Sequence, residues 1–192
     1  MTRPLLIGLT GLAGSGKDTV RSLLEQDHDF DGIAFADPIR DMLGVLFDSM
    51  EIPRDWMIER DLKEQDIPSL GVSYRKMAQA LGTEWGRALN SNLWLDIAAE
   101  KIRVCQQYGN PGVVISDVRF VNEAQWIKSK GGVIWKILRP GLEPVRAHIS
   151  EQLAAKLPYD YVIDNRGTID ELGHAVTSAV LQFVGTPTET QQ

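Results

Sequence analysis

The residues GLAGSGKDT at positions 11–19 have the types and the spacing of a loop that binds phosphate. Gly11, Gly16 and Lys17 fit the pattern G-x-x-x-x-G-K. Glycines let the backbone fold so that several N–H groups point at one phosphate, and the lysine adds a positive charge. An apolar run precedes the loop and a helical pattern follows it, so the N-terminus of a helix would also face the anion. The segment therefore predicts a nucleotide phosphate site.

Asp18 departs from the usual pattern, which has Ser or Thr after the lysine to bind Mg²⁺. Three roles are open for its carboxylate. It could ligate Mg²⁺ directly, hold a magnesium-bound water or orient a basic side chain, or simply sit favourably in the first turn of a helix. Thr19 still offers a hydroxyl one position further on. The phosphate cradle is therefore predicted to be intact, with only the metal ligand altered.

A second acid, Asp117, directly follows the apolar run VVIS. This is the usual place for an acid that associates with Mg²⁺ in phosphoryl transfer. The alternative is that Asp117 caps a helix beginning near residue 118, and both roles could hold. Arg119 follows two residues later, at the same edge of the predicted sheet.

Three further arginines are candidates to bind an acceptor's phosphate. Arg40 lies one turn into a helix that follows the second predicted strand, while Arg75 and Arg87 flank the segment MAQALGTEWG. Arginine suits this role because its planar guanidinium matches phosphate oxygens. The alternative for a helix with two arginines is a solvated surface.

Two glycines interrupt the helical periodicity between Arg75 and Arg87, at positions 82 and 86. Polar and aromatic side chains lie between these glycines: Thr83, Glu84 and Trp85. Such a cluster on a broken helix predicts a pocket for a nucleobase, with Trp85 stacking on the base. Packing in the core is the alternative for Trp85.

Arg139 and Arg146 lie in the Pro- and Gly-rich stretch RPGLEPVRAHISEQL. A mobile basic flap over a transferring phosphate would have this composition. His148 and Glu151 have the spacing H-x-x-E, but no third ligand is nearby, so we expect no metal site there.

The elements that must position these residues alternate between strand and helix patterns. Short apolar runs predict strands at residues 5–10, 32–36, 112–117, 133–138 and 161–165. Helical patterns occupy residues 17–26, 37–47, 73–89, 93–107, 120–130 and 168–184. Asp37 and Thr168 are predicted N-caps, with Glu171 completing a capping box, and residues 51–70 contain no strand pattern. The alternation predicts a parallel sheet covered on both faces, with ligands beyond the carboxyl ends of its strands.

Composition sets limits on the class of protein. The 192 residues are 43% hydrophobic and carry a formal net charge of −6, which gives no general attraction to nucleic acid or anionic lipid. The single cysteine excludes a disulfide framework. No apolar run reaches membrane-spanning length and no signal peptide is present, so we expect a soluble cytoplasmic protein.

Taken together, six blocks of the sequence resemble the bacteriophage-type deoxynucleoside monophosphate kinases. In the order of the family they are GLAGSGKDT, FADPIRDML, RKMAQALGTEWGR, ISDVRFVNEAQWI, LRP followed by HISE, and VIDNRGTIDEL. The resemblance implies transfer of the γ-phosphate of ATP to a deoxynucleoside 5′-monophosphate (dNMP), giving dNDP and ADP, with Mg²⁺ as cofactor. It also implies host-cell cytoplasm for a phage-encoded protein, and it leaves a homodimer open.

The resemblance further implies the fold of P-loop nucleoside monophosphate kinases. This is a three-layer α/β fold with a five-stranded parallel sheet flanked by helices, a helical acceptor-binding insertion and a lid. We expect one domain at residues 1–184, with its core at about 1–50 and 110–184. The insertion would occupy about 51–109, the lid about 139–157, and a disordered tail 185–192.

The same resemblance assigns roles to individual residues. The catalytic residues would be Lys17, Arg119, Arg139 and Arg146. ATP would be bound by Gly11, Ala13, Gly14, Ser15, Gly16, Lys17, Asp18, Thr19, Asn165 and Gly167. The dNMP would be bound by Arg40, Arg75, Thr83, Glu84, Trp85, Arg87, Asp117, Arg119 and Glu123. Asp18 and Asp117 would hold the metal.

Two alternatives to this function remain at the level of sequence. One is a related P-loop kinase with another small acceptor, such as dephospho-coenzyme A, although the motif LGTEWGR favours a nucleotide. The other is a nucleotide-binding module that transfers no phosphate. Nucleotide switches need a base-recognition motif, and no N-K-x-D occurs in the chain.

Overall fold

A computed structural model of the chain describes residues 4–142 and 156–184, which fall into two compact units. Unit 1 comprises Met1–Ala34 and Ala99–Gln192, and unit 2 comprises Phe35–Ala98. The predicted disordered tail, 185–192, and most of the predicted lid lie outside the described residues. The expected boundaries of core, insertion and lid stay predictions.

Unit 1 is built on a five-stranded parallel sheet, as the sequence predicts. The strands are β1 (Leu5–Thr10), β2 (Asp31–Ile33), β5 (Gly112–Ile115), β6 (Val133–Leu138) and β7 (Tyr161–Asp164). Their order across the sheet is β2-β5-β1-β6-β7, and each neighbouring pair is parallel. Every loop that leaves the carboxyl end of a strand therefore starts at the same edge of the sheet.

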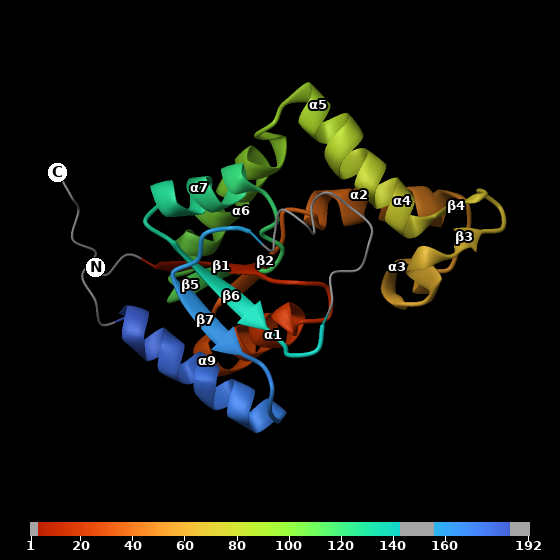
Figure 1. Cartoon of the computed structure of the whole chain (residues 1–192). Coiled ribbons are helices and arrows are strands. Elements are labelled where there is room, and N and C mark those ends of the chain that lie inside the picture. The colour runs from red at the N-terminus through yellow and green to blue at the C-terminus, as the bar shows by residue number, and fades with distance from the viewer. Residues whose placement is uncertain (1–3, 143–155, 185–192) are drawn as a thin grey trace. The chain divides into compact units, whose positions relative to one another are not determined.

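Helices cover both faces of this sheet (Figure 1). Helices α1 (Lys17–His28) and α9 (Ile169–Val184) lie on one face, and α7 (Val121–Ser129) lies on the other with the unit 1 part of α6 (Leu93–Gln107). Side chains of β1 alternate between the faces: Ile7 and Leu9 belong to the core with α1 and α9, while Gly8 approaches Ile127 of α7. Because both faces of the sheet are covered, β1 is a nearly continuous apolar run that ends at the buried Thr10.

Local signals at helix ends are borne out at α9. The Thr168 hydroxyl accepts a hydrogen bond from the Glu171 N–H at 3.2 Å, and the Glu171 carboxylate accepts one from the Thr168 N–H at 2.7 Å. This is the predicted capping box. The predicted strand at 32–36 is wrong in its bounds, because β2 ends at Ile33, opposite the last residue of β5.

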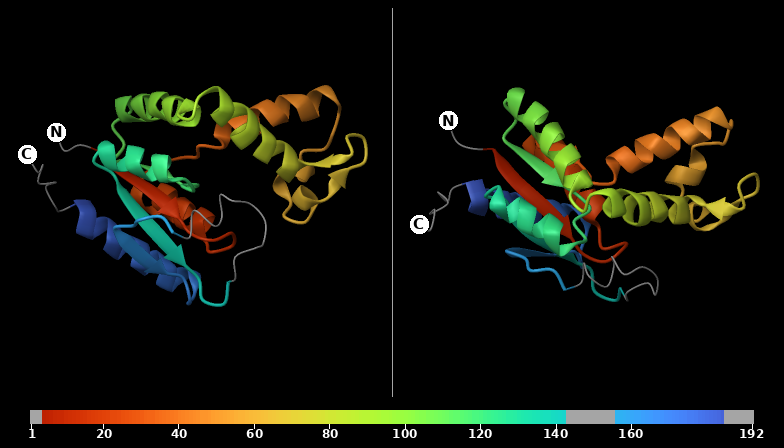
Figure 2. Two further views of the ribbon diagram at one scale, coloured as in Figure 1. Left: turned by 45° about the horizontal axis from the view of Figure 1, so that its top comes forward. Right: turned by 90° about the horizontal axis from the view of Figure 1, so that it is seen from above.

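Unit 2 contains short helices and a small hairpin (Figure 2). In chain order these are α2 (Asp37–Ser49), α3 (Asp55–Ile58), the 3₁₀ turn η1 (Leu62–Glu64), β3 (Asp66–Ile67), β4 (Val72–Ser73), α4 (Tyr74–Gln79), the π-helical η2 (Ala80–Gly86) and α5 (Arg87–Leu89), followed by the start of α6. Strands β3 and β4 pair antiparallel, so the expectation of no strand in residues 51–70 is wrong. Two residues are too few to produce a period-2 pattern.

Helix α2 begins one residue earlier than the sequence predicts. Ala36 is the N-cap and Asp37 is the first helical residue, with a proline in the first turn. The Asp37 carboxylate instead accepts a hydrogen bond from Arg40 within the helix.

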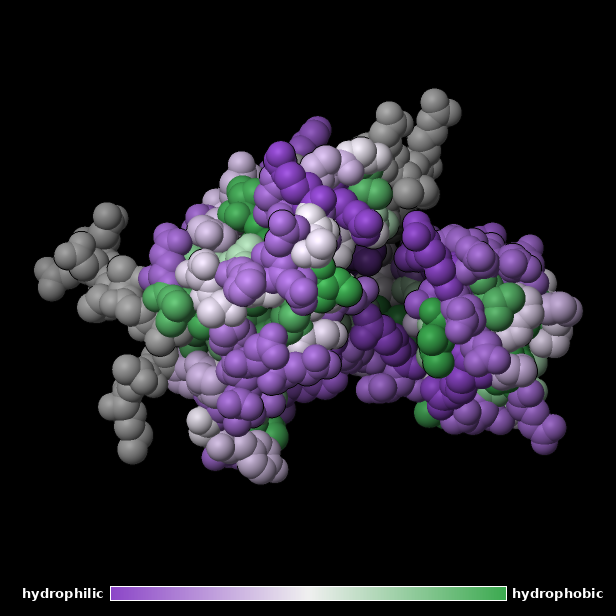
Figure 3. Space-filling model, turned by 90° about the horizontal axis from the view of Figure 1, so that it is seen from below, coloured by the Kyte–Doolittle hydropathy of each residue, from purple (hydrophilic) through white to green (hydrophobic). Residues whose placement is uncertain are grey.

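Hydrophilic side chains predominate on the face of each unit drawn in Figure 3, with apolar side chains scattered among them. No helix in the described part of the chain is both long enough and apolar enough to cross a lipid bilayer. This agrees with the lack of a membrane-length apolar run in the sequence.

Candidate active site

The loop between β1 and α1 has a backbone that only glycine adopts readily. Gly11, Gly14 and Gly16 have φ angles of 143°, 79° and 100°. A Cβ on Gly11 would lie 2.5 Å from the carbonyl oxygen of Ile137 in β6 and 2.9 Å from the Ser15 hydroxyl. The glycines of the sequence motif are therefore required by backbone conformation and by close approach to the neighbouring strand.

Lys17 begins helix α1 and turns back over the loop. Its ammonium group donates to the carbonyl oxygens of Gly11 at 2.9 Å and Leu12 at 2.8 Å. The Ser15 N–H donates to the same Leu12 carbonyl at 3.1 Å. The loop is thus a closed turn around a half-buried cation.

Asn165 joins this loop to the end of β7. Its side-chain amide donates to the Ser15 carbonyl at 2.8 Å, and its backbone N–H donates to the Leu138 carbonyl at 2.6 Å. A Cβ on Gly16 would lie 2.3 Å from the Asn165 amide nitrogen. Residues far apart in sequence therefore meet at the carboxyl edge of the sheet.

The loop after β5 lies beside the end of β1. The Val118 N–H donates to the Leu9 carbonyl at 3.1 Å, which brings half-buried Asp117 and Arg119 to the same edge as the glycine loop. Helix α7 begins at Val121 with Phe120 as its N-cap. The alternative interpretation of Asp117 as a helix cap near residue 118 is therefore wrong.

Glu123 is a buried acid, only 3% exposed, beneath this loop. Its carboxylate accepts hydrogen bonds from the N–H groups of Arg119 at 2.7 Å and Phe120 at 3.0 Å. A buried carboxylate needs such donors. These bonds fix the backbone that carries Arg119, a role that the sequence pattern did not reveal.

The other candidates in unit 1 differ in exposure. Asp18 is exposed in the first turn of α1, and Arg139 is exposed directly after β6, while Ala13 and Thr19 are half-buried. Gly167 precedes the α9 capping box, and Arg146 lies outside the described residues. No three His, Cys, Asp or Glu side chains gather as a ready metal site in residues 4–142 and 156–184.

In unit 2, two predicted acceptor arginines are paired with acids. Arg40 binds Asp37 at 2.7 Å and Arg75 binds Glu64 at 2.8 Å. Burial raises the pKa of the Tyr74 phenol, and the charges of Arg40 and Arg75 act against that shift. The charges of both guanidinium groups therefore influence the buried phenol of Tyr74. Tyr74 directly precedes Arg75, but no sequence pattern indicated it.

The predicted base-binding segment is a π-helical turn, a geometry frequent at functional sites. The Trp94 indole N–H donates to the Gly82 carbonyl at 2.8 Å, and a Cβ on Gly86 would lie 2.2 Å from the Trp94 ring. Trp85 is 46% exposed, with its ring centroid 6.5 Å from that of Trp94. Trp85 is therefore exposed and does not pack in the core, which was the alternative for it. Trp94 is the tryptophan that packs in the core.

The rest of that turn presents polar groups. Thr83 and Arg87 are half-buried and Glu84 is exposed. The structure thus collects the predicted residues into two groups, one at the carboxyl edge of the sheet in unit 1 and one on α2, α4, η2 and α5 of unit 2.

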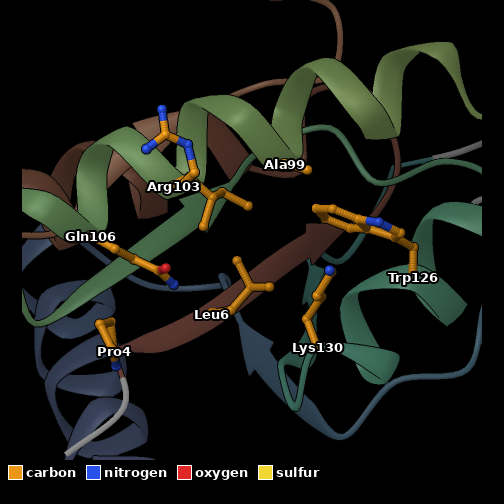
Figure 4. A pocket seen from close by; sticks show the side chains of 8 residues that line it. Pro4, Leu6, Ala99, Arg103, Gln106, Trp126 and Lys130 are labelled. Carbon is orange, nitrogen blue, oxygen red and sulfur yellow. The ribbon is translucent and has the colours of Figure 1, made fainter. Parts of the chain in front are cut away.

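A separate hollow of about 240 Å³ lies in unit 1 between β1, α6 and α7 (Figure 4). Leu6, Ile102 and Trp126 line it together with the longer polar chains of Arg103, Gln106 and Lys130. Pro4, before the first residue of β1, also lines it, so it lies toward the amino end of that strand. It contains none of the predicted site residues.

Comparisons with known proteins agree with this geometry. The family model described as deoxynucleotide monophosphate kinase matches residues 63–176. A protein of Acanthamoeba polyphaga mimivirus described as a deoxynucleotide monophosphate kinase is 36% identical over 189 residues, covering 92% of this chain and 96% of that protein. The deoxynucleoside-5′-monophosphate kinase of Escherichia phage T5 is 43% identical over 68 residues, 34% of this chain and 26% of that protein.

Among solved structures, shikimate kinase from Aquifex aeolicus has a TM-score of 0.53 at 15% identity. The match covers 95% of this chain and 100% of that one. At this identity the likeness shows the fold alone, and it confirms the predicted α/β P-loop kinase architecture.

Proposed function

Because the chain belongs to the deoxynucleotide monophosphate kinase family, we propose that it transfers the γ-phosphate of ATP to a dNMP with Mg²⁺ as cofactor. Family membership gives the reaction class, phosphoryl transfer from a nucleotide donor to a nucleoside monophosphate. It also removes the alternatives of a dephospho-coenzyme A acceptor and of a module without transfer. The choice of ATP, the metal and the roles of individual residues are the proposal.

The donor phosphates bind at the glycine loop of unit 1. The observation that carries this step is the closed turn in which Lys17 bonds the Gly11 and Leu12 carbonyls and glycines hold positive φ angles. The inner N–H groups and the ammonium of Lys17 bind the β- and γ-phosphates of ATP. The adenine lies toward Gly167, at the loop after β7.

Asp18 and Asp117 are suited to hold Mg²⁺. Carboxylate oxygens match this hard cation, which commonly takes one or two protein carboxylates and completes its shell with water and substrate phosphates. The lack of a cluster of three ligands among the described residues fits such a site. When bound, the cation neutralises charge on the phosphate oxygens.

The dNMP is bound by residues of unit 2. Arg40, Arg75 and Arg87 hold its phosphate, and Thr83, Glu84 and Trp85 contact its base. Arg40 and Arg75 are each paired with an acid at the surface, where a phosphate can replace a carboxylate. Exposed pairs of this kind are weak, so replacing them requires little free energy.

The chemical step needs no general base, because the attacking group is already a phosphate oxyanion. Catalysis then rests on alignment of the two nucleotides and on stabilisation of the charge that moves with the phosphoryl group. Lys17 and Arg119 supply that positive charge, together with Arg139 and Arg146 from the proposed lid. Closing the site also excludes water, which is a competing acceptor.

The direct test is to incubate the full chain with γ-labelled ATP, Mg²⁺ and each dNMP, and to separate the products by thin-layer chromatography. We expect label in a dNDP for at least one base. Release of labelled phosphate alone, or no reaction with any dNMP, would contradict the proposal. A parallel panel of ribonucleotides measures the preference for deoxyribose.

The metal assignment is tested by Asp18→Ala. If Asp18 holds Mg²⁺ directly or through water, the Mg²⁺ concentration for half-maximal rate should rise about tenfold, because outer-shell and ligand changes typically have effects of this size. An unchanged magnesium titration would mean that Asp18 only stabilises the first turn of α1. Asp27→Ala, at the other end of the same helix, is the matched control.

A further inference from the structure

Asn165 lies where three segments of unit 1 meet. Its side-chain amide donates to the Ser15 carbonyl at 2.8 Å, and its backbone N–H donates to the Leu138 carbonyl at 2.6 Å. Leu138 is the last residue of β6, directly before Arg139. One residue thus ties the glycine loop to the ends of both β6 and β7.

The bond to Ser15 acts on the direction of a peptide group. In a planar trans peptide the C=O and the following N–H point in opposite directions. By holding the Ser15 carbonyl, the Asn165 amide turns the Gly16 N–H away from itself. Gly16 is the last glycine before Lys17, and its φ angle of 100° is one that the loop must hold in place.

A side chain at position 16 would displace the Asn165 amide. A Cβ there would lie 2.3 Å from the Asn165 amide nitrogen, well inside van der Waals contact. Gly16 and Asn165 therefore fit each other as a pair. The half-buried Asn165 amide thus has a role in the loop beyond the predicted place on the adenine side of the donor.

From this geometry we infer that Asn165 is a positioning residue for donor binding: its amide fixes the Ser15–Gly16 peptide so that the Gly16 N–H faces the phosphates of the donor. The inference rests on the proposed function of the loop. It predicts that loss of the Asn165 donor weakens recognition of the phosphates while leaving recognition of the base and of the dNMP unchanged.

The test uses inorganic tripolyphosphate, which has the phosphates of ATP and no base. Its affinity for the full chain is measured by competition against ATP in the presence of Mg²⁺. Asn165→Ala should weaken tripolyphosphate and ATP by the same factor, about tenfold, which is the size expected from one hydrogen bond. Asn165→Asp should weaken both further, because it puts a carboxylate against a carbonyl oxygen and near the phosphates. The KM for the dNMP should not change in either variant.

The outcomes separate the possible roles. If Asn165→Ala weakens ATP but leaves tripolyphosphate unchanged, Asn165 contacts the base and the inference is overturned. Unchanged affinity for both ligands overturns it equally. If the parent protein itself does not bind tripolyphosphate, the proposal that the glycine loop binds phosphate is wrong. This result is distinct from failure of the role inferred for Asn165.

Asn165→Asp and one further variant guard against a loss of folding. Asn165→Asp has nearly the same size and shape as the parent residue, so it serves if Asn165→Ala does not fold. Thr168→Ala, in the same loop, removes a helix cap without touching Ser15, and it should leave tripolyphosphate affinity unchanged.

Discussion

The glycine loop of unit 1 and the arginine group of unit 2 are proposed to bind phosphate by different means. The loop relies on backbone geometry, with three glycines at positive φ and carbonyl groups held by Lys17 and Asn165. The arginine group relies on side chains, and two of its members are paired with acids at the surface. The first kind of site is fixed before ligand binds, while the second exchanges one anion for another.

The two regions should therefore tolerate different substitutions. Backbone sites are sensitive to an added Cβ, because Gly11 and Gly16 have positive φ angles and close neighbours at the Cβ position. Side-chain sites are sensitive to the loss of one charged group and tolerant of changes around it. Substitutions should therefore separate donor binding from acceptor binding.

Lys17→Ala should have the largest effect of all. It removes the positive charge that the loop holds against the transferring phosphate, so kcat should fall about 10²–10³-fold, as for other groups that stabilise transition-state charge. Steady-state kinetics with ATP and the best dNMP measures this. Lys130→Ala, at the end of α7 and outside the predicted site, is the control. Near-normal turnover in Lys17→Ala would remove the proposed mechanism.

Gly16→Ala tests the proposal that the backbone of the glycine loop binds the donor. A Cβ at φ 100° is strained by about 1–3 kcal/mol and would also meet the Asn165 amide, so the KM for ATP should rise about 10–100-fold. The KM for the dNMP should stay within a factor of two or so, since the residue lies outside unit 2.

The matched control for that change is Gly109→Ala. Gly109 also has a positive φ, 78°, but nothing lies within 4 Å of its Cβ position. If both variants raise the KM for ATP equally, general strain explains the effect and the loop has no special geometry.

Arg87→Ala tests the proposal that arginine side chains of unit 2 bind the acceptor. One charge-assisted hydrogen bond contributes about 1.5–3 kcal/mol, so the KM for the dNMP should rise about 10–100-fold with little change in the KM for ATP. Arg103→Ala, whose guanidinium is paired with Glu100, should change neither. A rise in the KM for ATP alone would move Arg87 to the donor side.

Thr168→Ala should have the smallest effect and none on binding. Loss of the α9 cap should lower stability by about 1 kcal/mol, or about 2–4 °C in Tm, with both KM values unchanged. A large rise in the KM for ATP would show that the cap also shapes the donor loop.

The cap also has a pH signature. Bonds from the Thr168 N–H and hydroxyl lower the pKa of Glu171 below its usual 4.5. A lowered pKa means that the stabilisation is present above the unfolded value and is lost as the pH falls through the folded value. Thr168→Ala keeps the backbone bond and removes only the hydroxyl bond, so the Tm difference between parent and variant should shrink only slightly as the pH falls below about 4.5.

Much of unit 1 could be predicted from sequence because its signals are local. The glycine loop, the apolar runs of the strands and the Thr168 cap each depend on residues within a few positions of one another. The contact of Asn165 with Ser15 spans 150 positions, and no local pattern could indicate it.

Unit 2 was harder because its elements are short. The two-residue strands β3 and β4 are too short to produce a periodic pattern. The sequence alone does not distinguish Trp85 from Trp94, although only Trp94 is buried. Tyr74 was missed because burial, rather than sequence, places it under the influence of two arginines.

On the proposed function, donor and acceptor phosphates are bound independently, by the backbone and Lys17 of the glycine loop in unit 1 and by arginine side chains in unit 2. Isothermal titration of the parent, Gly16→Ala and Arg87→Ala proteins with a non-hydrolysable ATP analogue and, separately, with the dNMP tests it most directly. We predict a crossed result, in which Gly16→Ala weakens only the ATP analogue and Arg87→Ala weakens only the dNMP. Equal weakening of both ligands by either variant, or the reverse assignment, would contradict the claim.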